Sequence, residues 1–374
     1  MGLPKIEINF TARAREVFKR ADRGIVGMIF KDAAVPQENP VEIIEKDDIP
    51  STLTSDHIDQ IKLALVGYKN SPKKVIVYVL GSEAEDYTEA LDYFSLHRVT
   101  YLCAPDADTD GATQSIAEWV KDQREKRNKV KAVLPDYEAD SEGIINYATA
   151  SVTLADTTPK AYVGEARVGK NAAGSKTYNT EKFCSRIAGL LAGTPAAMSS
   201  TYAILEDVVS CETKPKKDLD NEIDAGKFVL YYDGENVKVG RGVNSLTTVK
   251  DGQSNAWKKI KVVETMDTIH DDLVKMIQDN YIGKLPNNYD NRCLLLSAVM
   301  SYFQELVTEG LLSRYTVEFD IDAIKDYLRN ELGVDTSDMT EDEIKQADTD
   351  SFVFLRADCG VLDAIEDVTI NITV

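Results

Sequence analysis

Histidine, cysteine and long apolar runs are all scarce in this chain of 374 residues. Its 5 cysteines are far apart and form no C-x-x-C pair, which favours reduced thiols over a zinc ribbon or a disulfide framework. Its 3 histidines, His57, His97 and His270, lack a metal-ligand spacing, and we interpret each as an isolated surface histidine. No apolar run is long enough to span a bilayer and the opening residues lack a signal-peptide core, so we expect a cytoplasmic chain.

Basic residues are outnumbered as well, with 43 Lys and Arg against 63 Asp and Glu and a formal net charge of −20. Binding to nucleic acid needs clustered Lys and Arg to neutralise phosphates, and an anionic membrane attracts the same residues. The charge balance therefore argues against both partners. Hydrophobic residues make up 43% of the chain, which is enough for a sizeable core, and the length predicts two or three domains.

Two short motifs match known ligand-binding loops only in part. Asp106–Gly111 reads D-x-D-x-D-G, as an EF-hand begins, but Ala117 stands where the bidentate Glu belongs. Gly164–Lys170 fits G-x-x-x-x-G-K, but Asn171 replaces the Ser or Thr that holds magnesium. We interpret both as ordinary loops. The sequence alone does not exclude a Ser-His-Asp catalytic triad, because the order of its residues along the chain depends on the fold. No G-x-S-x-G nucleophile elbow occurs. We predict no catalytic residue, no cofactor and no metal site, and hence no enzyme.

Residues 23–225 alternate apolar strands with amphipathic helices. Strands that are apolar on both faces and alternate with helices predict an α/β core with a mainly parallel sheet. The expected strands are 25–30, 41–44, 75–80, 99–104 and 131–134, with candidate extensions at 144–145 and 161–163, and the expected helices are a capped helix ending at Gly67 and helices at 83–96, 112–127 and 181–191.

The character changes after about residue 225, where the pattern predicts an α+β C-terminal domain. Residues 227–232 and 237–243 flank the turn Asp233–Asn236 and predict a hairpin. Further strands are expected at 258–263, 315–320 and 352–355, helices at 267–281, 291–309 and 323–332, and a surface loop or short helix at 335–350.

Both ends of the chain alternate apolar and polar residues with the period of a strand. A lone strand with one apolar face is not stable in water, so each end must pair with a sheet in this chain or in another. We therefore expect extended N- and C-terminal strand arms. Their apolar faces consist of Ile6, Ile8 and Phe10 at one end and Val368, Ile370, Ile372 and Val374 at the other.

The segment Arg241–Thr248 reads R-G-V-N-S-L-T-T and resembles the R-G-[VI]-N-[ST]-L-T segment of contractile phage tail sheath proteins. Residues 257–269 and 281–288 continue the resemblance, and upstream segments at 23–27, 186–195 and 200–202 are also similar. It covers nearly the whole chain and points to the compact sheaths of Firmicutes phages, defective prophages and phage-tail-like bacteriocins, although 335–350 has no counterpart. The motif positions singled out are Arg241, Gly242, Asn244, Leu246 and Thr247.

The resemblance implies a structural subunit that polymerises around an inner tube and contracts to drive that tube through a cell envelope, without nucleotide hydrolysis. It implies a subtilisin-like core without protease activity, and terminal arms that add strands to the C-terminal domains of neighbours. The implied partners are further copies of the chain, the inner tail tube protein, and baseplate and tail terminator proteins, with no nucleic acid and no membrane contact. The implied location is a virion tail or phage-tail-like particle, assembled in the cytoplasm of the host bacterium.

The part of the chain that faces the tube is a further question. The polar segment Asp267–Tyr281 is a candidate tube-facing helix, with Asp271 and Asp272 as exposed positions to probe. The residues alone also allow a nucleotide-binding or hydrolase-like α/β enzyme, or a monomeric binding module with a swapped terminal strand. The expected parts are an N-terminal arm and linker (1–22), an N-terminal α/β part (23–96), a central α/β sheath core (97–225), a C-terminal α+β domain (226–362) and a C-terminal strand arm (363–374).

Overall fold

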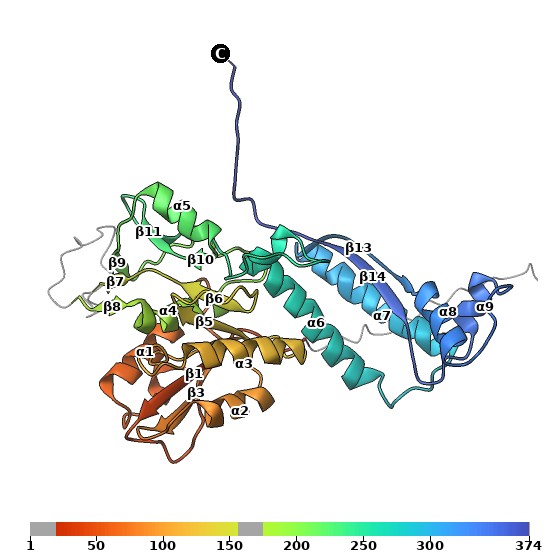
Figure 1. Cartoon of the computed structure of the whole chain (residues 1–374), viewed down its shortest axis with the longest axis horizontal. Coiled ribbons are helices and arrows are strands. Elements are labelled where there is room, and N and C mark those ends of the chain that lie inside the picture. The colour runs from red at the N-terminus through yellow and green to blue at the C-terminus, as the bar shows by residue number, and fades with distance from the viewer. Residues whose placement is uncertain (1–19, 156–174, 374) are drawn as a thin grey trace, which may run out of the picture.

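A 7-stranded sheet forms the centre of the larger lobe of the computed structural model, which describes residues 20–155 and 175–373 (Figure 1). Neighbouring strands are parallel except at one edge, where β2 runs antiparallel to β3. The predicted α/β core with a mainly parallel sheet is thus confirmed. In spatial order the strands are β10 (Lys227–Phe228), β6 (Ile144–Tyr147), β5 (Lys131–Pro135), β4 (Tyr101–Cys103), β1 (Ile25–Asp32), β3 (Lys74–Gly81) and β2 (Val41–Ile43).

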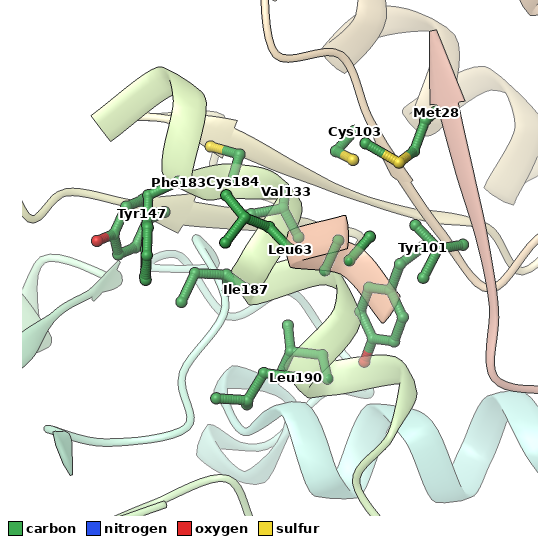
Figure 2. Close-up of a cluster of buried hydrophobic side chains, with 14 of the residues drawn as sticks. Met28, Leu63, Tyr101, Cys103, Val133, Tyr147, Phe183, Cys184, Ile187 and Leu190 are labelled. Atoms are coloured by element: carbon green, nitrogen blue, oxygen red, sulfur yellow. The ribbon is translucent and has the colours of Figure 1, made fainter. Parts of the chain in front are cut away.

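Helices cover both faces of this sheet because its central strands are apolar on both sides. α1 (Ser55–Val66) and α4 (Thr180–Ala192) pack on one face, and α2 (Thr88–Leu96) and α3 (Thr113–Glu125) pack on the other. Figure 2 shows Phe183, Ile187 and Leu190 of α4 meeting Leu63 of α1 and the side chains of the sheet. The two helices approach closely at Gly189, where an added Cβ would lie 2.0 Å from the carbonyl oxygen of Ala64.

Smaller antiparallel sheets flank the large one. β11 (Leu230–Tyr232) and β12 (Val237–Val239) form the predicted hairpin. β7 (Ser151–Leu154) pairs with both β8 (Thr177–Asn179) and β9 (Val208–Cys211), a sheet that the sequence pattern did not predict, and α5 (Lys216–Asp224) was also missed. The predicted extension at 161–163 lies outside the described residues.

The smaller lobe combines helices with one two-stranded sheet. α6 (Ile260–Asn280) runs from the large sheet into this lobe, and α7 (Tyr289–Thr308) follows it (Figure 1). β13 (Leu312–Phe319) and β14 (Leu355–Val361) pair antiparallel, with the apolar residues of α7 against one face. α8 (Ile321–Asn330) and α9 (Glu341–Gln346) pack beside them around Ile344 and Leu328. Of the helices in the described ranges, none is long and apolar enough to cross a membrane.

Two predicted elements of this lobe need correction, and a third, the loop or short helix expected at 335–350, does contain a short helix. The strand expected at 258–263 is wrong, because a short 3-10 helix at Asn255–Lys258 leads directly into α6. β-branched Val262 and Val263 are buried in this first turn, so tertiary packing overrides their strand propensity. The strand expected at 352–355 begins only at Leu355 and continues to Val361. Residues 335–350 contain α9, whose buried Ile344 ties the segment to the lobe.

Candidate functional site

The motif segment 241–247 lies beside the residues that lead into α6. The backbone amide of Asn244 donates to the carbonyl oxygen of Lys258 at 3.0 Å, and its side-chain amide donates to that of Trp257 at 2.7 Å. The side-chain oxygen of Asn244 accepts from the amide of Leu246 at 3.1 Å, and the whole asparagine is buried. An asparagine that both donates and accepts here sets the path of two adjacent segments at once.

Gly242 is the position of closest approach in the motif. Its amide donates to Thr201 Oγ1 at 2.9 Å, and a Cβ at this position would lie 2.6 Å from Ser200 Oγ. A side chain here would force the Ser200 hydroxyl to shift, because the motif packs closely on the loop that follows α4. The close packing, rather than a left-handed backbone, favours glycine at this position.

The end of the motif is tied to the loop before β6. The amide and hydroxyl of Thr247 donate to Asp140 Oδ1 at 2.7 and 3.0 Å, and the amide of Thr248 donates to the same oxygen at 2.8 Å. Burial by itself raises the pKa of Asp140, but these backbone donors outweigh it and lower the pKa to about 2. The hydroxyl of Ser245 donates to the carbonyl oxygen of Ser141 at 2.9 Å. The motif therefore connects the large sheet to the start of α6.

A buried carboxylate, Glu366, sits at the root of the C-terminal segment. Its side chain is only 4% exposed. Its Oε1 accepts from Thr201 Oγ1 at 2.6 Å and from Ser199 Oγ at 3.2 Å. Its Oε2 lies 2.9 Å from Lys259 Nζ and 3.8 Å from Arg241 Nε. We call Glu366 with these four partners the Glu366 clasp; the first residue of the family motif is part of it.

The segment beyond the clasp, Asp367–Thr373, belongs to the predicted C-terminal arm (363–374). Arg241 Nη2 binds Asp367 Oδ1 at 2.7 Å, and from there the chain runs away from both lobes (Figure 1). The described residues after β14 form neither helix nor strand in this single chain. The apolar side chains of Val368, Ile370 and Ile372 are 69%, 74% and 80% exposed. The predicted arm residues Val374, Ile6, Ile8 and Phe10 lie outside the described residues.

The linker from the N-terminal segment is anchored on α6 itself. The amide of Ala21 donates to Asp272 Oδ1 at 2.8 Å, and Arg23 binds Asp271 at 2.8 Å and Glu264 at 2.5 Å. Asp271 and Asp272 are each 4% exposed. The expectation that these two aspartates are exposed is therefore wrong, because both hold the linker inside the molecule, while the tube-facing role of the helix stays a prediction.

Deeper ion pairs join α6 to the large sheet. Asp267 accepts from both terminal nitrogens of Arg124 at 3.0 and 3.1 Å and from Lys131 Nζ at 2.9 Å. Lys131 Nζ also lies 2.9 Å from Glu264 Oε1, which accepts from the hydroxyl of Tyr101 at 2.5 Å. Burial opposes the ionisation of Glu264, but the charges of Lys131 and Arg23, together with the hydrogen bond from Tyr101, outweigh it and lower the pKa to about 2. These carboxylates are therefore charged, and they fix α6 to α3, β4 and β5.

His57 is not the surface histidine that the sequence predicted. It is buried, with Nδ1 2.7 Å from Asp32 Oδ2 and Nε2 3.1 Å from Asp106 Oδ2. The first contact resembles the His–Asp half of a catalytic triad, but a carboxylate stands where the triad would place its nucleophilic hydroxyl. His97 is exposed and stacks on a tyrosine, and His270 is half-buried beside Asp271. The pattern could not show the burial, since His57 and its partners are distant in sequence.

The Asp106–Gly111 loop forms contacts within the protein. The amides of Asp108 and Thr109 donate to Glu181 at 2.8 Å each, and Asp110 accepts from the hydroxyl of Tyr87 at 2.9 Å. Within residues 20–155 and 175–373, no group of three His, Cys, Asp or Glu side chains could hold a metal ion. The Gly164–Lys170 motif lies outside the described residues.

Comparisons with known proteins match this architecture. Residues 81–245 match the family model of the phage tail sheath protein central domain, and residues 252–374 match that of the phage tail sheath C-terminal domain. The tail sheath protein of Clostridium phage phiCD119 is 34% identical over 99% of both chains.

Solved structures show the same fold at low sequence identity. The contracted helical sheath of the anti-feeding prophage superposes with a TM-score of 0.68 at 14% identity, covering 100% of this chain and 99% of that one. A chain of the baseplate of the same particle gives a TM-score of 0.63 at 13% identity, covering 100% and 99%. The sheath tail protein of Desulfitobacterium hafniense gives a TM-score of 0.64 at 17% identity, covering 84% and 94%.

Proposed function

This chain belongs to the phage tail sheath family, and from that membership we propose that it is the repeating subunit of a contractile sheath that polymerises around an inner tube. The predicted membership of the tail sheath family is thus confirmed. The phiCD119 relative is a tail sheath protein, and we assign this chain a structural role of the same kind rather than an enzymatic one. The proposal extends to baseplate, tube and terminator proteins as partners, and one matched chain does come from a baseplate.

The C-terminal arm is the observation that carries the proposal. Its exposed residues Val368, Ile370 and Ile372 alternate with polar ones, and they contact no sheet in the described part of their own chain. Burying such side chains contributes about 1.5–3 kcal/mol each. An added strand also gains main-chain hydrogen bonds, while its alternate side chains fill pockets. The arm therefore gains most of its stability only when a second copy supplies a sheet.

The β13–β14 sheet can supply that site. Within the described parts of the chain it has two strands, so each strand has one edge without a partner. β14 has 7 residues and β13 has 8, which matches the length of the arm. We assign one edge to the C-terminal arm of a neighbour and the other to an N-terminal arm bearing Ile6, Ile8 and Phe10. Two arms and two edges would link each copy to others in a continuous lattice.

Contraction in this proposal needs no nucleotide hydrolysis. The subunits would rotate and shift as near-rigid bodies while the arms keep them linked. Interfaces that repack between the extended and contracted states would then hold the stored free energy. In this scheme the parts 1–22 and 363–374 are the linking arms, and the subtilisin-like core and the C-terminal domain are the bodies that move.

Deletion of Asp367–Val374 tests the exchange of strands. We expect the truncated protein to stay monomeric, because assembly depends on the arm. It should remain folded, with the circular dichroism spectrum of the full-length chain, because the two lobes do not depend on the arm. Ile370→Asp should block assembly in the same way, since it puts a charge on the apolar face. Asn371→Asp, on the polar face, is the matched control and should assemble. Sheaths of normal length in negative-stain micrographs of the truncated protein would refute the proposal.

A further inference from the structure

The C-terminal arm is long enough to pair with its own sheet. β14 has 7 residues, and the arm from Asp367 to Thr373 covers the same length. Between them, 362–366 is a connection of the size that joins many hairpins. In the described chain β14 is paired on one side only. Chain length therefore allows a hairpin in which the arm folds back antiparallel onto β14.

Such a hairpin would compete with polymerisation. A segment tethered by a short connection reaches its own acceptor at an effective concentration in the millimolar range. The arm of another copy arrives only at the concentration of the protein in solution. A subunit that exchanges arms therefore needs a feature that keeps the arm off its own sheet.

The connection after β14 is fixed in a path that does not reverse. The amide of Leu362 donates to the carbonyl oxygen of Leu311 at 2.9 Å, and Lys261 Nζ donates to the carbonyl oxygen of Leu362. Asp363 pairs with Lys259 at the surface, and this partly exposed pair adds little to the fixed path because such pairs contribute about 0–1 kcal/mol. The segment that would have to form a hairpin loop is therefore bound along the start of α6.

The Glu366 clasp completes this path at the root of the arm. Its partners come from three separate places: Ser199 and Thr201 after α4, Arg241 after β12, and Lys259 before α6. All of them belong to the junction between the lobes, so the root of the arm is bound at this junction. From this point the arm runs outward (Figure 1).

We infer that the Glu366 clasp directs the C-terminal arm toward a second copy of the chain by preventing its return to the β13–β14 sheet of its own subunit. This inference rests on the proposed exchange of strands. It makes Glu366 and Arg241 positioning residues, which act on the direction of the arm without contacting the acceptor sheet. It also gives the first residue of the family motif a role in assembly.

The test compares Glu366→Ala with Asp363→Ala in the full-length chain. Asp363 also pairs with Lys259, but it is 37% exposed and touches neither serine nor threonine of the clasp, so its replacement is the matched control. Two readouts are needed: the protein concentration at which sheaths form, and hydrogen–deuterium exchange of residues 367–373 in dilute, unassembled protein. Glu366→Gln, which keeps the acceptor oxygen and loses the charge, provides an intermediate variant that preserves side-chain shape.

We expect Glu366→Ala to raise the assembly concentration about tenfold or more, because it removes hydrogen bonds to a charged group. Its arm should become protected from exchange in the monomer, as a strand paired with β14 would be. Wild type and Asp363→Ala should show an unprotected arm, and Glu366→Gln should fall between. Assembly of Glu366→Ala at the wild-type concentration, or an arm that exchanges freely in monomers of both Glu366 variants, overturns the clasp.

Failure of the clasp and failure of strand exchange give different patterns. If the chain that lacks Asp367–Val374 cannot assemble but Glu366→Ala assembles like wild type, only the role of the clasp is refuted. If the truncated chain assembles normally, strand exchange itself is refuted and the clasp with it.

Discussion

Replacing Asp267 by alanine removes the carboxylate on which Arg124 and Lys131 converge. The three side chains are at most 7% exposed, and the contacts are 2.9–3.1 Å long. At an effective dielectric constant of about 20, each pair is worth roughly 5–6 kcal/mol of Coulomb energy before desolvation is counted. Desolvation cancels much of this, and removing one partner of a buried pair costs about 3–5 kcal/mol. We expect a loss near the lower value, about 3 kcal/mol, because Lys131 still contacts Glu264.

Urea unfolding of the dilute, unassembled chain measures this loss through tryptophan fluorescence. A second measurement uses pH. Burial opposes ionisation of Asp267, yet the charges of Lys131 and Arg124 lower its pKa in the folded state below the usual value. A carboxylate with a lowered folded pKa contributes its stability above the unfolded pKa, about 3.9, and loses it as the pH falls toward the folded value. The difference between wild type and Asp267→Ala should therefore be largest near pH 7 and should shrink below about pH 4.

Asp122→Ala is the control for this prediction. Asp122 pairs with Lys126 one turn along α3, with both side chains about half exposed or more, and such pairs contribute about 0.3–0.5 kcal/mol. A loss below about 1 kcal/mol for Asp267→Ala, or a difference from wild type that is unchanged at acid pH, would refute the view that buried ion pairs fix α6 to the sheet.

Two further substitutions probe the large lobe. Burial opposes protonation of His57, but hydrogen bonds to its two carboxylate partners outweigh burial and raise its pKa in the folded state. The protonated histidine therefore stabilises the fold below the unfolded pKa of about 6.5, and this stabilisation is lost as the pH rises through the folded pKa. His57→Gln should thus lose about 1 kcal/mol more stability at pH 6 than at pH 9 in urea titrations; equal losses would contradict the paired, charged histidine. Gly189→Ala should lower the free energy of unfolding by about 1–3 kcal/mol, because its Cβ would meet the backbone of Ala64. Gly81→Ala, whose Cβ would meet nothing within 4 Å, should change it little, and equal effects of the two alanines would rule out close packing of α1 on α4.

The roots of both terminal segments meet α6, and this arrangement explains the acidic character of that helix. Asp271 and Asp272, in the second half of α6, bind the N-terminal linker. Lys259 and Lys261, at the start of α6, bind the segment that follows β14. Read alone, the polar residues of α6 predicted a surface. The linker groups that Asp272 and Asp271 bind lie 251 and 248 positions away in sequence, so no local pattern could identify them.

The sequence by itself determined the elements whose signal is local. Apolar strands separated by amphipathic helices predicted the parallel sheet, and the turn Asp233–Asn236 predicted the β11–β12 hairpin. The motif that begins at Arg241 predicted the family. Alternation also predicted that the terminal segment pairs with a sheet. These features depend on periodicity or on turn chemistry, and neither requires knowledge of distant contacts.

Tertiary structure alone decided what depends on contacts between distant residues. Residues 258–263, predicted as a strand, lead into α6 and form its first turn, because Val262 and Val263 are buried there by tertiary packing. Tertiary structure also placed His57 between two aspartates and Glu366 in a clasp. A carboxylate that is buried and paired looks the same in sequence as one in solvent. Only the packing of segments from four parts of the chain distinguishes them, since both burial and the availability of a partner are properties of the folded state.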